Sequence, residues 1–281
     1  MDLRRAAFAG SWYPDSAAEC ETDIQRFIEK AGQPETACIG GIVPHAGWFF
    51  SGEIACQVIH GLSYGPPPDV VVVFGMHLHP ESPRYIMAEG AWDTPFGALH
   101  IETDVARHLN ETFSFQVETA QHHTQDNTIE LQLPFIKYFF KDTKIVPLGL
   151  PPVDASLDIG VAVADTVSTL GLNARVIGST DLTHYGFNYG YAPMGSGSSA
   201  VDWVVKENDR RVVDAMLSMD PGAVIKEGVA NQNACCAGAA ATAIAASRAL
   251  GATRAEEVAY ATSYDKNPSD SFVGYVGILF S

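Results

Sequence analysis

One pattern occurs three times in the sequence: a run of apolar residues that leads directly into a short segment with a histidine. The three stretches read IGGIVPHAG, VVVVFGMHLHP and ARVIGSTDLTHYG, and they contain His45, His77 with His79, and Asp181 with His184. Neutral imidazole is a good ligand for iron, zinc and copper, and a carboxylate or thiolate completes such sites. The pattern therefore predicts a shared site for metal binding or proton transfer.

The residues alone leave alternatives open at each position. A histidine after a strand can equally be an ordinary hydrogen-bonded loop residue. His77 and His79 compete, because in an extended segment they face opposite sides and at most one reaches a shared metal. Asp181 and His184 are spaced i,i+3 and share one face if a helical turn begins there, whereas Asp181 could instead cap that turn.

Two adjacent cysteines begin an alanine-rich segment, residues 233–250, that we expect to be a helix. A thiol at a helix N-terminus feels the positive end of the helix dipole, which favours the thiolate, and we assign this position to Cys236. We place Cys235 in the core as a small hydrophobic residue. The chain has five cysteines without regular spacing and no CxxC pair, so neither a disulfide framework nor a structural zinc knuckle is expected.

The elements that must position these residues alternate between strand and helix along the chain. The run VVVVF at residues 70–74 does not alternate with polar residues, which is typical of strands covered on both faces. In an open α/β sheet the carboxyl ends of such strands share one edge, where ligands bind. Because no linker is long enough to separate domains, we predict a single domain over residues 1–281, built as a three-layer α/β/α sandwich.

The composition excludes several classes of function. Apolar residues make up 47% of the 281 residues and charged residues only 18%, which argues for a large core and against disorder. The net charge of −16 repels phosphate backbones and anionic membranes, so we expect neither nucleic acid nor membrane as a partner. The segment MDLRRAAFAGSWYP carries no signal-peptide hydrophobic region, and we therefore expect a cytoplasmic protein. Arginine is scarce near the histidine motifs, which disfavours phosphate transfer.

Taken together, the motifs resemble those of the Memo family, whose bacterial and archaeal members are often called AmmeMemoRadiSam system protein B. The resemblance runs nearly from end to end. It rests on AGSWY at residues 9–13, VPHAGW at 43–48, FGMHLH at 74–79, TPFG at 94–97, DNTIE at 126–130, STDLTHYG at 179–186 and CAG at 236–238. Several motifs in the family's order are far more specific than any single one.

The resemblance implies a mixed, largely parallel central sheet and a fold similar to class III extradiol dioxygenases. Those enzymes hold non-haem Fe(II) with two histidines and a carboxylate, whereas Memo-like proteins are expected to use two histidines and a cysteine. Carried over by position without a gap, the ligands are His45, His79 and Cys236, and a shift of one or two residues substitutes His77 for His79. Asp181 and His184 are then expected to line the same pocket, with His184 as the acid or base.

Two departures from the family pattern bear on activity. The family segment EHSIE reads DNTIE here, so Asp126 and Asn127 replace a glutamate and a histidine. In the dioxygenase relatives a histidine outside the metal set acts as base, and this replacement puts ring cleavage in doubt. Met76 stands where the family has proline, which indicates a different local turn.

Three functions follow as hypotheses. The first is a dioxygenase-like oxidoreductase with Fe²⁺, or with copper or zinc, acting on a small aromatic or diol substrate between Trp48, Phe49 and Tyr185. The second is a metal or redox protein without turnover that acts through protein partners. The third is a zinc-dependent hydrolase, disfavoured because the motifs offer no basic residues to anchor a substrate.

Overall fold

The computed structural model describes residues 2–29, 31, 32, 34 and 36–281. Its central feature is a mixed nine-stranded sheet. The middle of the sheet consists of adjacent parallel strands, all formed by apolar runs. In spatial order they are β2 (Gly40–Val43), β9 (Ala174–Ser179), β3 (Val70–Gly75) and β8 (Lys144–Gly149). Their carboxyl ends therefore meet at one edge, as the sequence predicts.

Toward both edges the sheet becomes largely antiparallel. On one side β12 (Phe272–Phe280) pairs antiparallel with β2, and β11 (Ala255–Thr262) and β10 (His184–Tyr185) pair with β12. On the other side β4 (Tyr85–Met87) pairs antiparallel with β8, and β7 (Gln116–Glu118) pairs with β4. A separate small sheet joins β1 (Leu3–Arg4), β5 (Ala91–Trp92) and β6 (Leu99–His100).

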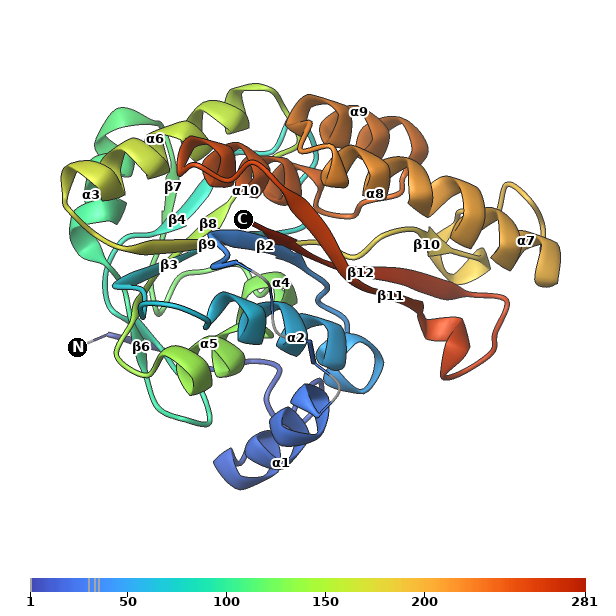
Figure 1. Cartoon of the computed structure of the whole chain (residues 1–281), viewed down its shortest axis with the longest axis horizontal. Helices are drawn as coiled ribbons and strands as arrows, with labels where there is room; N and C mark the ends of the chain where they lie inside the picture. Colours follow the sequence, from blue (N-terminus) through green and yellow to red (C-terminus); the bar gives the residue numbers. More distant parts are fainter. Residues whose placement is uncertain (1, 30, 33, 35) are drawn as a thin grey trace.

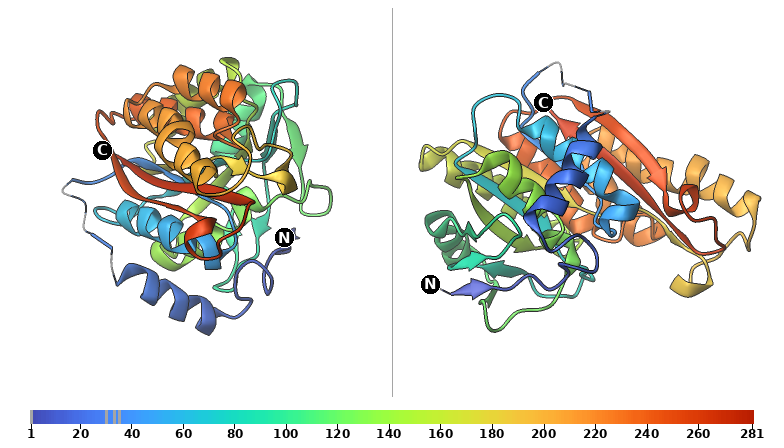
Figure 2. Two further views of the ribbon diagram at one scale, coloured as in Figure 1. Left: turned by 90° about the vertical axis from the view of Figure 1, so that its right-hand side faces the viewer. Right: turned by 90° about the horizontal axis from the view of Figure 1, so that it is seen from below.

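Helices cover both faces of the large sheet, which confirms the predicted α/β sandwich (Figures 1 and 2). One layer, at the top of Figure 1, contains α3 (Thr103–Thr112), α6 (Ala155–Thr169), α8 (Asp209–Leu217), α9 (Pro221–Asn231) and α10 (Ala237–Ala249). The opposite layer contains α1 (Ala17–Ile28), α2 (Glu53–Leu62), α4 (Asn127–Glu130) and α5 (Leu133–Phe140). A short helix, α7 (Ser198–Trp203), extends beyond the sheet.

Neighbouring strands β2 and β9 send the chain to opposite faces. After β2 the chain enters α2 in the lower layer, whereas the segment after β9 leads to the upper layer that contains α10 (Figure 1). Such a reversal opens a crevice beyond the strand ends. The described part of the chain contains no helix long and apolar enough to cross a membrane.

Helix α10 lies unusually close to the sheet because both partners have small residues. Almost the whole helix is buried, and most of its buried residues are alanines. A Cβ atom built on Gly178 of β9 would lie 2.8 Å from the Ala243 Cβ atom and 3.0 Å from the Ala239 carbonyl oxygen. This contact fixes the N-terminus of α10, and the cysteines that precede it, over the end of β9.

We predict that Gly178→Ala destabilises the fold by about 1–3 kcal/mol, because overpacking forces α10 away from β9. Urea unfolding of the variant and the parent measures the difference. The matched control is Gly222→Ala in α9, where the nearest neighbouring atom to the new Cβ lies 3.5 Å away. Equal stabilities of the two variants would contradict a tight contact between α10 and β9.

Candidate metal centre and adjoining cavity

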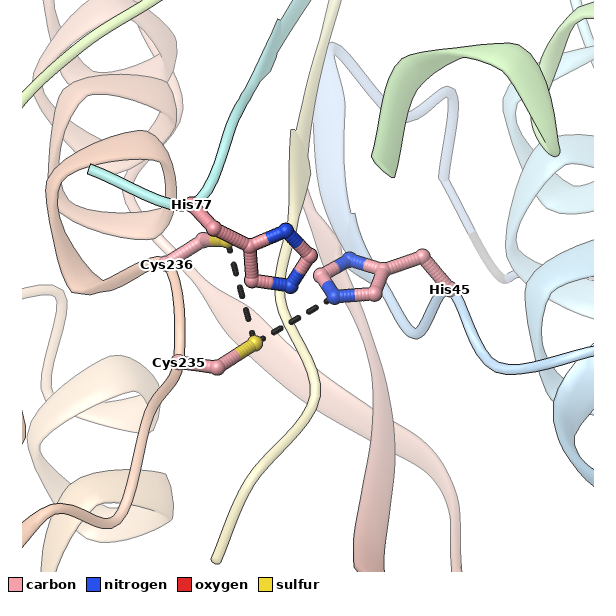
Figure 3. A group of neighbouring side chains, drawn as sticks. All are labelled: His45, His77, Cys235 and Cys236. Carbon is pink, nitrogen blue, oxygen red and sulfur yellow. Dashed lines mark hydrogen bonds between the residues drawn. The ribbon is translucent and has the colours of Figure 1, made fainter. Parts of the chain in front are cut away.

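Four side chains converge beyond the strand ends. One nitrogen atom from each of His45 and His77 and the sulfur atoms of Cys235 and Cys236 all lie within 4.8 Å of one another (Figure 3). His45 follows β2, His77 follows β3, and the cysteines immediately precede α10. The centre thus lies over β9, the strand between β2 and β3.

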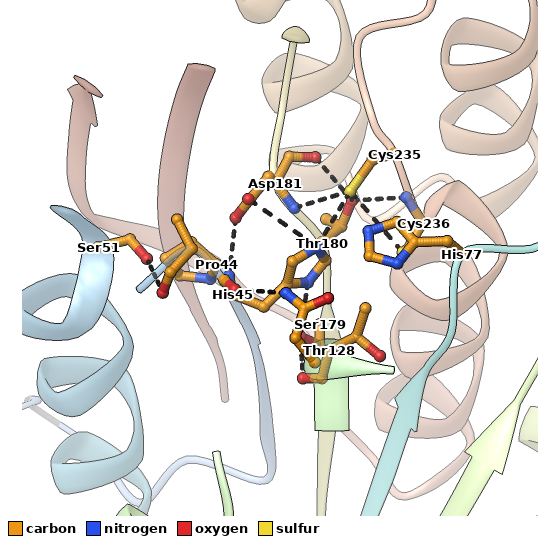
Figure 4. Close-up of polar contacts among 12 residues, drawn as sticks. Pro44, His45, Ser51, His77, Thr128, Ser179, Thr180, Asp181, Cys235 and Cys236 are labelled. Atoms are coloured by element: carbon orange, nitrogen blue, oxygen red, sulfur yellow. Dashed lines mark hydrogen bonds and ion pairs between the residues drawn. The ribbon is translucent and has the colours of Figure 1, made fainter. Parts of the chain in front are cut away.

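His45 is held by hydrogen bonds that leave one ring nitrogen for the centre (Figure 4). Its backbone N–H donates to Asp181 Oδ1 at 2.7 Å, and the side chain is buried. Ser179 Oγ donates its single proton to the Thr128 carbonyl at 2.7 Å, so it accepts from His45 Nδ1 at 3.0 Å. Nε2 is therefore the free nitrogen, and it lies 3.2 Å from Cys235 Sγ. This arrangement fixes the tautomer and ring orientation, as partners of metal-bound histidines do.

His77 has the same kind of support from a carboxylate. Its Nδ1 donates to Asp126 Oδ2 at 3.0 Å, and its backbone N–H donates to the same oxygen at 3.2 Å. Asp126 is itself fixed as the N-cap of α4, where it accepts from the Thr128 N–H. His77 Nε2 is thereby left for the centre, although the side chain is 44% exposed.

A left-handed residue turns the chain so that His77 enters the centre. Met76 has φ = 71°, and its N–H donates to Thr128 Oγ1 at 2.7 Å. Proline has φ fixed near about −65°, so a proline at position 76 cannot adopt this conformation. The turn at Met76 therefore differs from any turn that a proline at this position could form.

The cysteines are attached to the segment after β9 by reciprocal contacts. The Cys235 N–H donates to the Asp181 carbonyl at 3.1 Å, and the Asp181 N–H donates to Cys235 Sγ at 3.3 Å. The Cys236 N–H donates to Thr180 Oγ1 at 3.0 Å. Helix α10 begins at Ala237, four residues after the predicted start at residue 233, so that Cys236 is its N-cap. The Cys236 sulfur lies 3.7 Å from that of Cys235.

The pKa values of the two thiols shift in opposite directions. Burial alone would raise the pKa of Cys235, but hydrogen bonding by Cys236 and the two imidazoles lower this pKa well below its usual value. Burial, together with the neighbouring Cys235 sulfur, raises the pKa of Cys236 well above its usual value. Burial alone would lower the pKa of both histidines. The nearby Asp181 and Cys235 nevertheless raise the pKa of His45, and Asp126 and Cys235 raise the pKa of His77 to about 10. In the metal-free centre these shifts favour a negative charge on the Cys235 sulfur beside protonated histidine rings.

Asp181 and His184 lie beside this centre, but they do not share a helical turn. Residues 180–183 have no helical structure, and His184 belongs to β10, so the helical turn that the i,i+3 spacing left open is absent. The residue between them explains why: the Thr183 N–H donates to the buried carboxylate of Asp209 at 3.1 Å, which holds the segment away from a helical path. Burial raises the pKa of Asp181 and, to about 6, that of Asp209.

A cavity of about 620 Å³ adjoins the centre, and His45, His77, Asp181 and His184 all contribute to its wall. Its other walls are aromatic or neutral and polar. They include Trp12, Phe49, Phe50, Asn127, Tyr189, Ser271 and Tyr275, and no lysine or arginine belongs to the described lining. Of the expected aromatic walls only Phe49 lines the cavity. Trp48 is buried in the core, stacked on Phe135 at 4.1 Å, and Tyr185 is stacked on Phe272.

The structure brings together His45 and Cys236 from the predicted ligand set, with His77, the alternative to His79. His79 is exposed, its N–H donates to Ser82 Oγ at 3.0 Å, and it lies outside the group of four. Cys235 is the residue that sequence reasoning missed. Cys235 is partly exposed and packs against the hydrophobic core, and its sulfur belongs to the group of four donor atoms. The only signal for it in the sequence is its position next to Cys236.

The comparisons with known proteins agree with the resemblance found in the sequence. The family model described as Memo-like protein matches residues 4–279. A MEMO1 family protein of Pyrococcus furiosus is 34% identical over 99% of this chain and 98% of its own length. Similar proteins of Thermococcus kodakarensis and Methanosarcina acetivorans are 32% and 33% identical, with 99% of each chain covered. The protein therefore belongs to the Memo family.

A solved structure shows the same general fold. The uncharacterized protein JW3007 from Escherichia coli K12 superimposes with a TM-score of 0.54 over 86% of this chain and 99% of its own. The two sequences are 10% identical, so this likeness extends to the fold alone.

We predict that Asp126→Ala weakens metal binding by about 10–100-fold, because His77 loses the acceptor that orients its ring. Competition against a chromophoric chelator measures the affinity. Asp220→Ala is the matched control, since Asp220 caps α9 by accepting from the Ala223 N–H at 3.0 Å. Both variants lose about 1 kcal/mol of capping energy, but only Asp126→Ala should lose metal affinity. Equal affinities of the two variants would contradict an orienting role for Asp126.

Proposed function

We propose that this protein binds a transition metal through His45, His77, Cys235 and Cys236. The observation that carries the proposal is the convergence of four donor atoms within 4.8 Å of one another. Hydrogen bonds from neighbouring residues hold both the histidines and the cysteines in place. Each histidine has its Nδ1 atom engaged by a hydrogen-bond acceptor, and each cysteine is attached through its backbone to the segment after β9.

The donor set fits a thiophilic metal. Two sulfurs and two imidazoles are a combination that suits Zn²⁺ or copper, whereas the facial iron sites of oxygenases combine two histidines with a carboxylate. The resemblance to extradiol dioxygenases put Fe²⁺ first, and the second sulfur moves copper and zinc ahead of iron in this proposal. A bound metal would supply Lewis acidity or, with copper or iron, electron transfer. Metal binding would displace the proton of the Cys236 thiol and the Nε2 proton of each protonated histidine.

We expect His45→Ala and Cys236→Ser each to weaken metal binding by at least about 10-fold, since each removes a ligand outright. Zinc content after dialysis and the thiolate absorption of the Co²⁺-substituted protein measure this loss. His79→Ala is the matched control, because this exposed histidine lies only two residues from His77 and outside the group. Unchanged metal content in both ligand variants, or an equal loss in His79→Ala, would reject the site.

A second candidate function is an oxidoreductase that acts on a small molecule in the adjoining cavity. The observation that favours it is that His45, His77, Asp181 and His184 all line one cavity with aromatic walls. The absence of a basic side chain from the described lining suits a neutral substrate rather than a carboxylate or phosphate. In this function, His184 would move protons at its free Nε2 atom, because its Nδ1 donates to the Leu182 carbonyl at 3.2 Å. A zinc hydrolase ranks lower, because Cys235 occupies the position that a metal-bound water needs.

Oxygen uptake by the Fe²⁺- or copper-loaded protein with a panel of catechols and other vicinal diols tests the oxidoreductase. Turnover should fall at least about 100-fold in His184→Ala, the size of effect expected for a general acid or base, while metal content stays at the parent level. His108→Ala, in α3, serves as the matched histidine control. No uptake with metal demonstrably bound would leave metal binding or protein partnership without turnover as the function.

A further inference from the structure

Cys235 and Cys236 are set apart from the other thiols of the chain. Cys20, Cys38 and Cys56 are buried in the core. The two adjacent cysteines instead point their sulfur atoms toward each other and toward the histidines, 3.7 Å apart (Figure 3). Cys235 is partly exposed, and its neighbours His45, His77 and Asp181 line the cavity.

Three polar groups surround the Cys235 sulfur. The Asp181 N–H donates to Cys235 Sγ at 3.3 Å, and His45 Nε2 lies 3.2 Å from it. Thr180 Oγ1 lies 3.8 Å away. The thiolate is the form of cysteine that attacks peroxides and disulfides, and the Asp181 N–H is the backbone donor that contacts this sulfur. Cys236 lies beside it in the position of a resolving thiol.

We propose that Cys235 and Cys236 form a redox-active dithiol, which a hydroperoxide converts to a vicinal disulfide. The Cys235 sulfur attacks the terminal oxygen of the hydroperoxide, and the O–O bond breaks. The leaving alkoxide (hydroxide, for hydrogen peroxide) takes up the proton that the Cys235 thiol loses, and departs as an alcohol (water, for hydrogen peroxide). The Cys236 thiol then attacks the Cys235 sulfenic acid, the S–S bond forms, and water leaves with the Cys236 proton. In total, two thiols and one hydroperoxide give one disulfide, one alcohol and one water.

The covalent geometry makes this disulfide reversible. Adjacent Cα atoms are about 3.8 Å apart across a trans peptide. Disulfide-bonded residues usually have Cα atoms roughly 4.4–6.8 Å apart, so a bond between neighbours is strained and easily reduced. Cys236 has φ = −126° and ψ = 52°, outside the helical region. The peptide that joins the cysteines can therefore rotate without unwinding α10.

The disulfide would also remove both sulfur donors from the centre. This consequence rests on the proposed metal-binding function, whereas the dithiol chemistry does not. Oxidation would then release a bound metal, and reduction would restore its site.

The experiment treats the purified full-length, metal-free protein with one equivalent of hydrogen peroxide. We expect thiol titration after denaturation to show the loss of two of the five thiols. The intact mass should fall by about two hydrogen atoms, one for each thiol oxidised to the disulfide, and dithiothreitol should reverse both changes. The peptide that contains residues 235 and 236 should carry the bond. A protein that gains only oxygen atoms, keeps five thiols or forms disulfide-linked dimers would overturn the inference.

Two variants make the assignment specific. Cys235→Ser should lose the decrease in mass, whereas Cys56→Ser, which removes a buried core thiol, should still lose two thiols. A zinc-loaded sample with a colorimetric zinc chelator separates the two proposals. Disulfide formation in a protein that never binds zinc would contradict the metal site alone, and zinc binding without disulfide formation would contradict the dithiol alone.

Discussion

The close packing of α10 on β9 is the constraint on which the candidate centre depends. Only glycine at position 178 and alanines along α10 allow the helix backbone to approach the strand so closely. This approach places the residues before α10 within hydrogen-bond distance of residues 180 and 181, which follow β9. The cysteines thereby reach the histidines of β2 and β3 without any loop that has to fold around a metal, and the centre can be formed before a metal arrives.

Asp181 connects the parts of the centre more directly than any other residue. Its carboxylate accepts from the His45 N–H, and its own N–H and carbonyl bind Cys235. It is buried, with Oδ2 3.9 Å from His45 Nε2, so its charge attracts a proton or a metal to that nitrogen. A buried carboxylate requires such partners, because unpaired it would cost several kcal/mol. Removing Asp181 would therefore disturb the histidine and the cysteine together.

The sequence predicts the central strands of the sheet well, but it predicts only part of the candidate metal centre. Unbroken apolar runs identify β2, β3 and β9, and the rule that parallel strands end at one edge places His45 and Asp181 correctly. The choice between His77 and His79 depends on the left-handed turn at Met76, which the residue type does not reveal, because non-glycine residues rarely adopt φ = 71°. Cys235 was missed for a similar reason. Its direction is set by contacts with residue 181, more than fifty positions away, which local patterns do not encode.

The second sulfur changes the chemistry that the fold presents to its cavity. A centre with two histidines and one cysteine keeps an open position for a substrate or a water molecule, as catalytic sites do, whereas two thiolates with two imidazoles complete a tetrahedron. In the proposed metal site, closing that position would favour retention of a soft metal over activation of a ligand. The cavity nevertheless remains, lined by the same histidines and by Asp181. If the two thiols are joined, both sulfur donors are lost together, and the proposed redox chemistry then couples the cavity to metal release and not to an open position on a bound metal.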